Sequence, residues 1–266
     1  MKGDMMQLNL EGKVAIVTGA NRGIGAGIAR QLAAEGMRVS LVARDEALLG
    51  ETAADIRQAS GADVTTVAID LRAPASAQTA VDRTVAAFGH VDLLVNNAGA
   101  TKRGDFFELT EDDWQDGLAL KLHGYVRMTR AAWPRLSSTQ GGIVNVVGIG
   151  AWTGVGEFTI GGVVNAGLMN FTKAMADLGK RDGVRVCAVN PGRIATDRLE
   201  RNLQRIANQS GTDRQQAAAL LLKECGINRF GTPDEIGAAV AFLASSAASF
   251  AQGTILDIDG GETRAI

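Results

Sequence analysis

The stretch that decides the fold is TGANRGIG, residues 18–25. It follows a short apolar run, KVAIVTG (13–19), and opens a helical pattern, IGAGIARQLAAEG (24–36). Apolar character that is continuous rather than alternating is typical of a strand buried on both faces of a sheet. A buried strand, a glycine-rich turn and a helix in this order predict the first half of a βαβ unit.

The same rhythm continues along the chain. Short apolar runs rich in β-branched residues alternate with helical patterns such as APASAQTAVDRTVAAFG, and these further runs are 38–44, 64–70, 91–97, 142–148, 184–192 and 254–261. Strands that alternate with helices are joined by parallel crossovers. We therefore predict an α/β fold with a doubly wound parallel sheet and helices on both faces, in a single domain over residues 1–266.

Two longer stretches interrupt this rhythm. Residues 101–113 follow the fourth apolar run, and residues 197–228 follow the sixth and contain a helical run, DRLERNLQRIANQ. In open α/β sheets, ligands bind at the carboxyl ends of the strands. We expect these two stretches to form the walls of a substrate pocket.

Composition excludes several classes of protein. A net charge of −2 argues against nucleic acid or an anionic membrane as the main partner. No apolar run approaches the ~18 residues of a membrane span. Cys187 and Cys225 have no metal-ligand spacing and fit a reducing compartment, so no metal site is expected. The N-terminal MKGDMMQLNLEG lacks the apolar segment of a secretory signal, which predicts a cytoplasmic protein.

The glycines of the opening stretch suit a phosphate-binding turn. Gly19 allows a tight turn after the strand, Gly23 lets the backbone approach a pyrophosphate, and Gly25 permits close packing of helix on strand. The helix N-terminus then supplies free N–H groups and a partial positive charge. The alternative is a glycine turn with only a structural role. Its place after a first strand favours a dinucleotide site.

From about residue 10 to 262 the chain resembles the short-chain dehydrogenase/reductase family. The motifs that carry the resemblance are TGANRGIG, NNAG (96–99), NPGRIAT (190–196) and the final RFGTPDEIGAAVAFLASSAASFAQGTILDIDGG. The resemblance implies a Rossmann-type parallel sheet of about seven strands, a nicotinamide dinucleotide, a small-molecule substrate and a homotetramer or homodimer. The cofactor-binding positions it implies are the loop residues Gly19, Asn21, Arg22, Gly23, Ile24 and Gly25, then Arg44, the adenine neighbours Asp70 and Leu71, Asn96 and Gly99 beneath the nucleotide, and Ile194 and Thr196 beside the nicotinamide carboxamide.

The end of the second apolar run bears on the choice of cofactor. A carboxylate there would bind the adenosine ribose of NAD and repel the 2′-phosphate of NADP. This chain has Ala43 at that position, Arg44 beside it and Arg22 in the glycine loop. Arginine pairs well with phosphate, so NADP(H) is favoured over NAD(H). If both arginines are only solvated surface charges, the choice stays open.

The resemblance places the family's catalytic groups on unexpected residues. The end of IVNVVG puts the serine at Gly148, and AGLMNFTKA puts the tyrosine at Gly161 and the lysine at Asn165. Positions 148 and 161 keep the family's spacing of thirteen residues, so the register needs no gap. The asparagine of the preceding helix corresponds to Lys121. Tyr125, the chain's single tyrosine, lies one helical turn further and does not fill the gap.

Two of these changes are reciprocal, since asparagine becomes Lys121 and lysine becomes Asn165. We hypothesise that Lys121 restores the positive charge near the nicotinamide ribose and, partly desolvated, has a lowered pKa that suits an acid or base. In the alternative, Lys121 is an exposed helix lysine and Asn165 a remnant. Glu157 is the second catalytic candidate, although it could merely complement a helix dipole. The remaining polar candidates are Trp152, Thr159 and His123, with Lys102, Arg103 and Arg193 as attractors of an anionic substrate.

Three functions follow from this pattern. The first, which the family favours, is an oxidoreductase on a small carbonyl or alcohol with a relocated proton-transfer group. The second is a lyase or isomerase that keeps the nucleotide on the same fold. The third is a catalytically silent nucleotide-binding subunit or sensor. Gly148, Gly161 and Gly162 also remove bulk beside the nicotinamide, which suggests a need for space or for close backbone approach.

Overall fold

The computed structural model describes residues 7–264 and contains one parallel sheet of seven strands in the order β3-β2-β1-β4-β5-β6-β7. Each predicted strand is present within a few residues of its expected bounds. The strands are β1 Val14–Thr18, β2 Arg38–Ala43, β3 Val64–Ala68, β4 Leu93–Asn96, β5 Gly142–Val146, β6 Arg185–Pro191 and β7 Ile255–Ile258. The predicted doubly wound α/β fold is confirmed.

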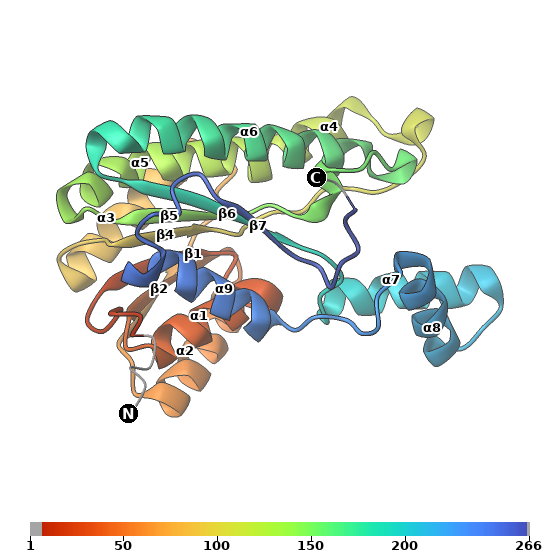
Figure 1. Cartoon of the computed structure of the whole chain (residues 1–266), viewed down its shortest axis with the longest axis horizontal. Helices are drawn as coiled ribbons and strands as arrows, with labels where there is room; N and C mark the ends of the chain where they lie inside the picture. Colours follow the sequence, from red (N-terminus) through yellow and green to blue (C-terminus); the bar gives the residue numbers. More distant parts are fainter. Residues whose placement is uncertain (1–6, 265–266) are drawn as a thin grey trace.

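Helices cover both faces of the sheet (Figure 1). In Figure 1, α5 and α6 lie above the sheet and α1, α2 and α9 lie below it, and α3 packs in the same apolar cluster as α5. The helices of the described residues are α1 Gly23–Ala34, α2 Glu46–Ser60, α3 Ser76–Phe88, α4 Glu111–Gly117, α5 His123–Thr139, α6 Thr159–Asp182, α7 Asp197–Ser210, α8 Arg214–Cys225 and α9 Pro233–Ala244. Short 3₁₀ turns are η1 Phe106–Glu108, η3 Ile149–Ala151, η4 Gly156–Phe158 and η5 Ser246–Ala248.

Local sequence explains where these helices begin. Asp45 caps α2 by accepting a hydrogen bond from the backbone N–H of Leu48. Thr232 and Glu235 form a reciprocal capping box at the start of α9, with Pro233 in its first turn. Such caps satisfy backbone donors that have no partner inside the helix.

The hydrophobic core is divided by the sheet. Every residue of β1 is buried, as expected for a central strand with helices on both sides. One apolar cluster packs the sheet against α1, α2 and α9, and a second packs it against α3 and α5. The strand order reverses between β1 and β4, which is the place where doubly wound folds bind ligands.

The segment between α4 and α5 is not a regular α-helix. Residues Leu118–Leu122 form a π-helical turn, η2, which contains Lys121. Turns of this kind are rare and are frequent at functional sites. No pattern in the sequence indicated this turn.

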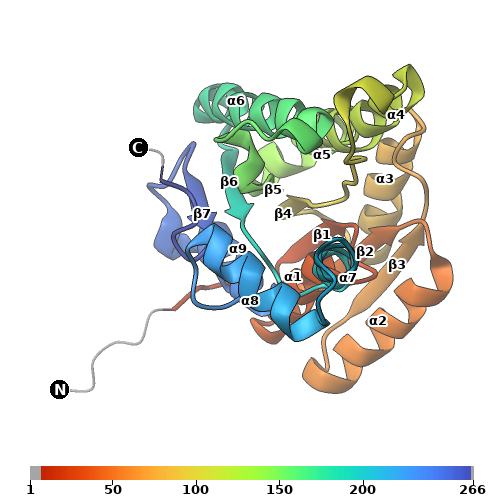
Figure 2. The same ribbon diagram turned by 90° about the vertical axis from the view of Figure 1, so that its right-hand side faces the viewer.

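The two predicted pocket stretches are more ordered than loops. Residues 101–113 contain η1 and the first residues of α4, and residues 197–228 form α7 and α8. Only the first of the latter two helices was expected. Figure 2 faces the right-hand end of Figure 1 and shows α7 and α8 in front of the strands.

Some predictions lie partly outside the described residues. Residues 1–6 and 265–266 are not described, so the predicted lack of an N-terminal signal and the single domain over residues 1–266 stay predictions. Within residues 7–264, no helix has both the length and the apolar character that crossing a membrane requires.

Candidate functional site

The glycine loop between β1 and α1 has the backbone that its glycines predict. Gly19 and Gly23 have φ values of +65° and +55°, in the left-handed region that favours glycine. A Cβ on Gly25 would collide with the carbonyl oxygen of Gly19. Asn97 fixes this turn, because its Nδ2 donates to the carbonyl oxygens of Thr18 at 2.9 Å and Gly19 at 3.2 Å. The NNAG motif pointed to this segment but not to that contact.

The N-terminus of α1 lies at the carboxyl end of β1 without a side-chain cap. Arg22 is the N-cap residue, its side chain makes no cap hydrogen bond, and no acidic residue lies in the first turn. Gly23 approaches Thr196 closely, since an added Cβ would be 3.4 Å from Thr196 Cγ2. The carbonyl oxygen of Asn21 accepts a hydrogen bond from a threonine of α2, and Ile24 packs on the core. A partial positive charge is therefore open to an anion here.

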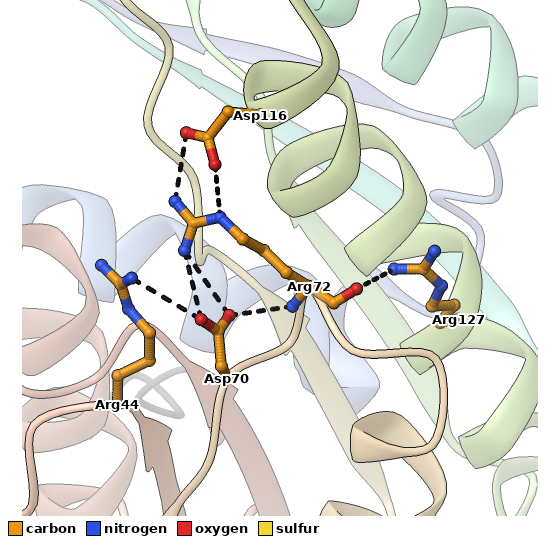
Figure 3. Close-up of polar contacts among 5 residues, drawn as sticks. All are labelled: Arg44, Asp70, Arg72, Asp116 and Arg127. Carbon is orange, nitrogen blue, oxygen red and sulfur yellow. Dashed lines mark hydrogen bonds and ion pairs between the residues drawn. The ribbon is translucent and has the colours of Figure 1, made fainter. Parts of the chain in front are cut away.

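A chain of ion pairs joins the ends of β2 and β3 to α4 (Figure 3). Asp70 accepts from the backbone N–H of Arg72 at 2.9 Å and lies 3.6 Å from Nη1 of Arg44. Arg72 donates to both carboxylate oxygens of Asp116, at 2.6 and 3.2 Å, and this lowers the pKa of Asp116. Arg127 donates to the carbonyl oxygen of Arg72 at 2.9 Å. Arg44 is the loosest member, because 61% of its side chain is exposed.

Four of the predicted cofactor positions are buried, namely Gly25, Leu71, Asn96 and Ile194. The Nδ2 of Asn96 donates to Asn145 at 3.0 Å and to Thr129 at 3.3 Å, so its side chain links β4 to β5 and α5. Its Oδ1 has no hydrogen-bond partner among residues 7–264. Buried acceptors normally have a partner. Ile194 forms an isolated parallel bridge with residue 231, and Thr196 is the N-cap residue of α7.

Lys121 and Asn165 lie in direct contact. The Nζ of Lys121 donates to Asn165 Oδ1 at 2.7 Å and to the carbonyl oxygen of Val147 at 2.6 Å. Asn165 is 3% exposed, and its Nδ2 donates to the carbonyl oxygen of Gly148 at 3.4 Å. The stem of Lys121 crosses Gly99, where a Cβ would lie 2.8 Å from Lys121 Cδ. The alternative of an exposed helix lysine is therefore wrong.

Charge and burial make Lys121 easy to deprotonate. Burial, followed by the positive charge of Arg198, lowers the pKa of Lys121 to about 7. A buried ammonium loses hydration, and a nearby cation opposes its charge further. Arg198 reaches this region from α7, and its Nη2 donates to the carbonyl oxygen of Gly99 at 3.3 Å. The amine of Lys121 can thus gain or lose a proton near neutral pH.

Gly148 has a backbone that few other residues adopt. Its φ is +121°, outside the conformations that side chains with a Cβ favour. Its N–H donates to Asn190 Oδ1 at 3.3 Å. A Cβ would also lie 3.2 Å from Nδ2 of Asn165. The glycine at this position supports a local backbone arrangement and does more than remove bulk.

The space beside Gly161 is filled rather than open. A Cβ on Gly161 would overlap the ring of Phe158, so this glycine allows a close approach. The guanidinium carbon of Arg103 lies 4.0 Å from the centroid of that ring, on its face. The sequence suggested that Gly148, Gly161 and Gly162 provide either space or close backbone approach, and at Gly161 the glycine allows close approach. Sequence reasoning did not single out Phe158, since aromatic residues before helices are common.

Tyr125 is not available for proton transfer. It is 1% exposed, and its hydroxyl donates to the carbonyl oxygen of Val146 at 2.8 Å. Burial raises the pKa of Tyr125 far above its usual range. The hydroxyl therefore stays protonated and internal.

Glu157 is separated from the buried pair by its own contacts. It lies in η4, 60% of its side chain is exposed, and its carboxylate is 3.7 Å from Nη1 of Arg205. Its carbonyl oxygen accepts from the backbone N–H of Gly104 at 3.1 Å, which ties η4 to the 101–113 stretch. The catalytic role of Glu157 stays a prediction.

The remaining polar candidates have separate surroundings. Lys102 pairs with Asp113 at 2.8 Å, and Arg193 pairs with Glu262 at 2.9 Å. His123 is exposed. The other two are Trp152, whose Nε1 donates to Asp257 at 3.1 Å, and Thr159, whose buried Oγ1 has no partner among residues 7–264. Across these same residues, no group of three or more His, Cys, Asp or Glu side chains is placed to hold a metal ion.

Comparisons with known proteins cover nearly the whole chain. A family model described as enoyl-(acyl carrier protein) reductase matches residues 19–263. The chain is 35% identical over 259 residues to the 3-oxoacyl-(acyl-carrier-protein) reductase FabG of Escherichia coli K12, covering 96% of this chain and 98% of that protein.

Solved structures of related proteins also match nearly the whole chain. The L-sorbose reductase from Gluconobacter frateurii, complexed with NADPH and L-sorbose, is 31% identical with a TM-score of 0.94. That match covers 98% of this chain and all of the other. A NAD⁺-bound xylitol dehydrogenase is 26% identical with a TM-score of 0.88, covering 95% of this chain and all of the other.

Proposed function

Because the chain belongs to the short-chain dehydrogenase/reductase family, we propose that it is an NADP(H)-dependent oxidoreductase of a small carbonyl or alcohol in which Lys121 exchanges the proton. The single observation that carries this proposal is the contact between Lys121 Nζ and Asn165 Oδ1 at 2.7 Å. In this proposal the two residues replace the family's tyrosine and lysine.

The residues present fit a dinucleotide. Gly19 and Gly23 keep the backbone open to a pyrophosphate, and the N-terminus of α1 has no side-chain cap or acidic residue to compete for it. Asn96, whose Oδ1 has no hydrogen-bond partner among residues 7–264, is the last residue of β4. Asp70 and Thr196 border this region on either side. When bound, the nicotinamide supplies or accepts the hydride.

Lys121 has the hydrogen bonds that a proton-transfer group needs. An ammonium has three N–H bonds, and Val147 and Asn165 accept two of them. The third is left for a substrate carbonyl oxygen. In the neutral amine, the same two acceptors engage both N–H bonds, and the lone pair takes the third direction. The group can therefore protonate a carbonyl oxygen or deprotonate an alcohol without moving.

The charges at the adenine end support NADP(H). Arg44 is exposed and holds Asp70 only at 3.6 Å, so little is lost when it turns to a 2′-phosphate. Arg72 holds Asp70 more closely, through its backbone N–H at 2.9 Å. Arg22 adds a further cation in the glycine loop. A related enzyme is described with NADPH, and another with NAD⁺.

A catalytically silent nucleotide-binding subunit or sensor is the second candidate. It is supported by Phe158, whose ring fills the space beside Gly161, and by the lack of a hydroxyl at positions 148 and 161. A lyase or isomerase on this fold would need the same nucleotide cradle. Turnover of nicotinamide separates these functions from the first.

The proposal is tested by binding and turnover together. Purified protein is titrated with NADPH and NADH, and a panel of carbonyls and alcohols is then followed at the nicotinamide absorbance band. We expect tighter binding of NADPH and turnover of at least one compound. Lys121→Met should bind NADPH and lose turnover. Lys180→Met, which alters an exposed lysine paired with Asp177 on α6, is the control and should keep it. Tight binding without turnover across the panel would favour the silent subunit.

Glu157 offers an alternative proton-transfer group, and its substitution distinguishes the two. If Glu157 supplies the proton, Glu157→Gln lowers kcat by about 10²-fold or more while Lys121→Met keeps most of it. In our proposal the order is reversed, since the carboxylate of Glu157 lies with Arg205 at 3.7 Å.

We also propose a homodimer or homotetramer and a cytoplasmic location. Exposed apolar side chains on the outer faces of α6 and α9 support self-association, among them Val163, Leu178 and Phe242. Sedimentation velocity at two protein concentrations tests the assembly. A monomer at both would contradict it.

A further inference from the structure

We propose that the substrate carries a carboxylate and that Arg103, stacked on Phe158, holds it while Lys121 faces the reacting carbonyl or hydroxyl group. This inference rests on the proposed oxidoreductase function and names the class of its substrate, a small oxo acid or hydroxy acid.

Arg103 is oriented by stacking and keeps its donors free. Its guanidinium carbon lies 4.0 Å from the centroid of the Phe158 ring. Stacking engages the face of a guanidinium and leaves the N–H bonds at its edge. Among residues 7–264, no carboxylate pairs with Arg103 and no acceptor takes its N–H bonds. Planar N–H pairs of this kind match the two oxygens of a carboxylate.

Phe158 connects this guanidinium to the buried pair. Both Phe158 and Asn165 border Gly150, where a Cβ would lie 2.8 Å from Phe158 Cε1 and 3.6 Å from Asn165 Nδ2. Asn165 in turn holds Lys121 Nζ at 2.7 Å. Arg103, Phe158, Asn165 and Lys121 therefore form a series of neighbouring side chains, and in this proposal the substrate extends along that series from Arg103 to Lys121.

The charges that act on Arg103 are mostly positive. Lys102, the preceding residue, is paired with Asp113 at 2.8 Å. Partial burial lowers the pKa of Arg103, and the positive charges of Arg193, Arg198 and Arg205 lower it further. A surface that gathers like charges around an unpaired cation attracts anions.

The acid whose charge acts on Arg103 favours a singly charged ligand. Glu157 lies 3.7 Å from Arg205 and raises the pKa of Arg103 through its negative charge. A doubly charged phosphate would be repelled by Glu157, whereas a carboxylate needs only the free edge of Arg103. Arg193 is taken by Glu262 at 2.9 Å and adds no free donor pair.

Matched pairs of substrates test this assignment. Pyruvate, acetoacetate and levulinate are compared with their primary amides, which keep the carbonyl and remove the charge. With NADPH, we expect kcat/KM for at least one acid to exceed that of its amide by about 10–100-fold, mostly through KM, because one charge-assisted contact is worth this much. Arg103→Ala should remove the preference, Arg103→Lys should restore part of it, and Lys102→Ala should leave it unchanged. Equal values for acid and amide in all three pairs, or a preference that survives Arg103→Ala, would overturn the inference.

A binding measurement separates this inference from the proposed function. Levulinate and levulinamide are titrated calorimetrically into protein saturated with NADP⁺, for the native chain and Arg103→Ala. The anion site is upheld if levulinate binds at least tenfold more tightly than its amide and Arg103→Ala abolishes this binding. If no compound is turned over in that case, the oxidoreductase function alone fails. Turnover of neutral carbonyls with no difference between the two probes upholds the function and overturns the anion site.

Discussion

The Nζ of Lys121, in η2, lies 2.7 Å from Oδ1 of Asn165, in α6. This contact places one ammonium and one amide where α6 and the helix before it meet, at the end of β5. Burial of the ammonium lowers its pKa to about 7. The pair thus combines a fixed position with a lysine whose pKa is close to neutral pH.

The first prediction concerns the pH dependence of turnover. Carbonyl reduction needs the ammonium form of Lys121, whose pKa is about 7, so kcat should be constant below pH 7 and fall about tenfold per pH unit well above it. Alcohol oxidation needs the neutral amine, so its kcat should rise up to pH 7 and then level off. Steady-state rates from pH 5 to 10 in both directions measure this. A break near pH 10, where an ordinary lysine titrates, would contradict the lowered pKa of Lys121 in the proton transfer.

The second prediction concerns stability. The pKa of Lys121 is about 7 in the folded chain and about 10.4 when unfolded. The unfolded chain therefore binds more protons between these values, and the free energy of unfolding should rise with pH by up to about 1.4 kcal/mol per unit. The destabilising effect of burial is complete below pH 7 and disappears toward pH 10. Urea unfolding of the native chain and Lys121→Met should show this slope in their difference. A difference that stays constant with pH would contradict it.

The third prediction concerns the reciprocal exchange. Asn165→Lys alone puts a second ammonium beside Lys121 and should destabilise the fold by about 3 kcal/mol or more. Adding Lys121→Asn removes the repulsion and should recover much of this loss, with a coupling of about 0.5–3 kcal/mol. Urea unfolding of the four proteins of the cycle gives the coupling. Additive effects would mean that the two positions act independently.

The fourth prediction compares two neighbouring glycines of α6. Gly161→Ala should destabilise the fold by about 1–3 kcal/mol, because its Cβ overlaps Phe158. Gly162→Ala is the matched control, since its Cβ meets only the carbonyl oxygen of Gly150 at 3.6 Å, and it should be neutral or stabilising by up to about 1 kcal/mol. In a Phe158→Ala background, the cost of Gly161→Ala should disappear. Equal effects of the two glycine changes would contradict this account.

The fifth prediction concerns Arg44. If Arg44 leaves Asp70 for a 2′-phosphate, Arg44→Ala should weaken NADPH binding by about 10–100-fold and leave NADH binding within about twofold. Fluorescence titration with the two nucleotides measures the ratio. Arg57→Ala, which alters an arginine of α2 bonded to the carbonyl oxygen of Val64 at 2.6 Å, is the control and should change neither. Equal losses for both nucleotides would assign Arg44 a structural role.

Much of the fold could be predicted from local patterns. Apolar runs located all seven strands, and they were most continuous in the central strands, because a strand buried on both faces tolerates few polar residues. The glycines of residues 18–25 predicted the turn correctly, because Gly19 and Gly23 have positive φ values that glycine adopts readily. Helix α8, RQQAAALLLKEC, was missed because its apolar residues form one continuous run and no stripe along one helix face.

The site was less accessible to sequence reasoning. The resemblance to the short-chain dehydrogenase/reductase family implied that Lys121 and Asn165 lie close together, and they are in contact. The ring of Phe158 beside Gly161, the positive φ of Gly148 and the clearance that Gly99 gives Lys121 all depend on how separate elements pack. No pattern in the chain encodes such clearances, since they depend on side-chain orientation and on the packing of separate elements.

The π-helical turn of η2 has a consequence for the phase of the helices that flank it. A π turn contains about one residue more than an α turn, and one residue corresponds to about 100° of rotation. The faces of α4 and α5 are therefore offset by this extra residue. Deleting a single residue between 118 and 122 would restore an unbroken α-helix, keep its apolar composition, and swing Lys121 away from Asn165. The number of residues between α4 and α5 therefore determines the direction in which Lys121 points.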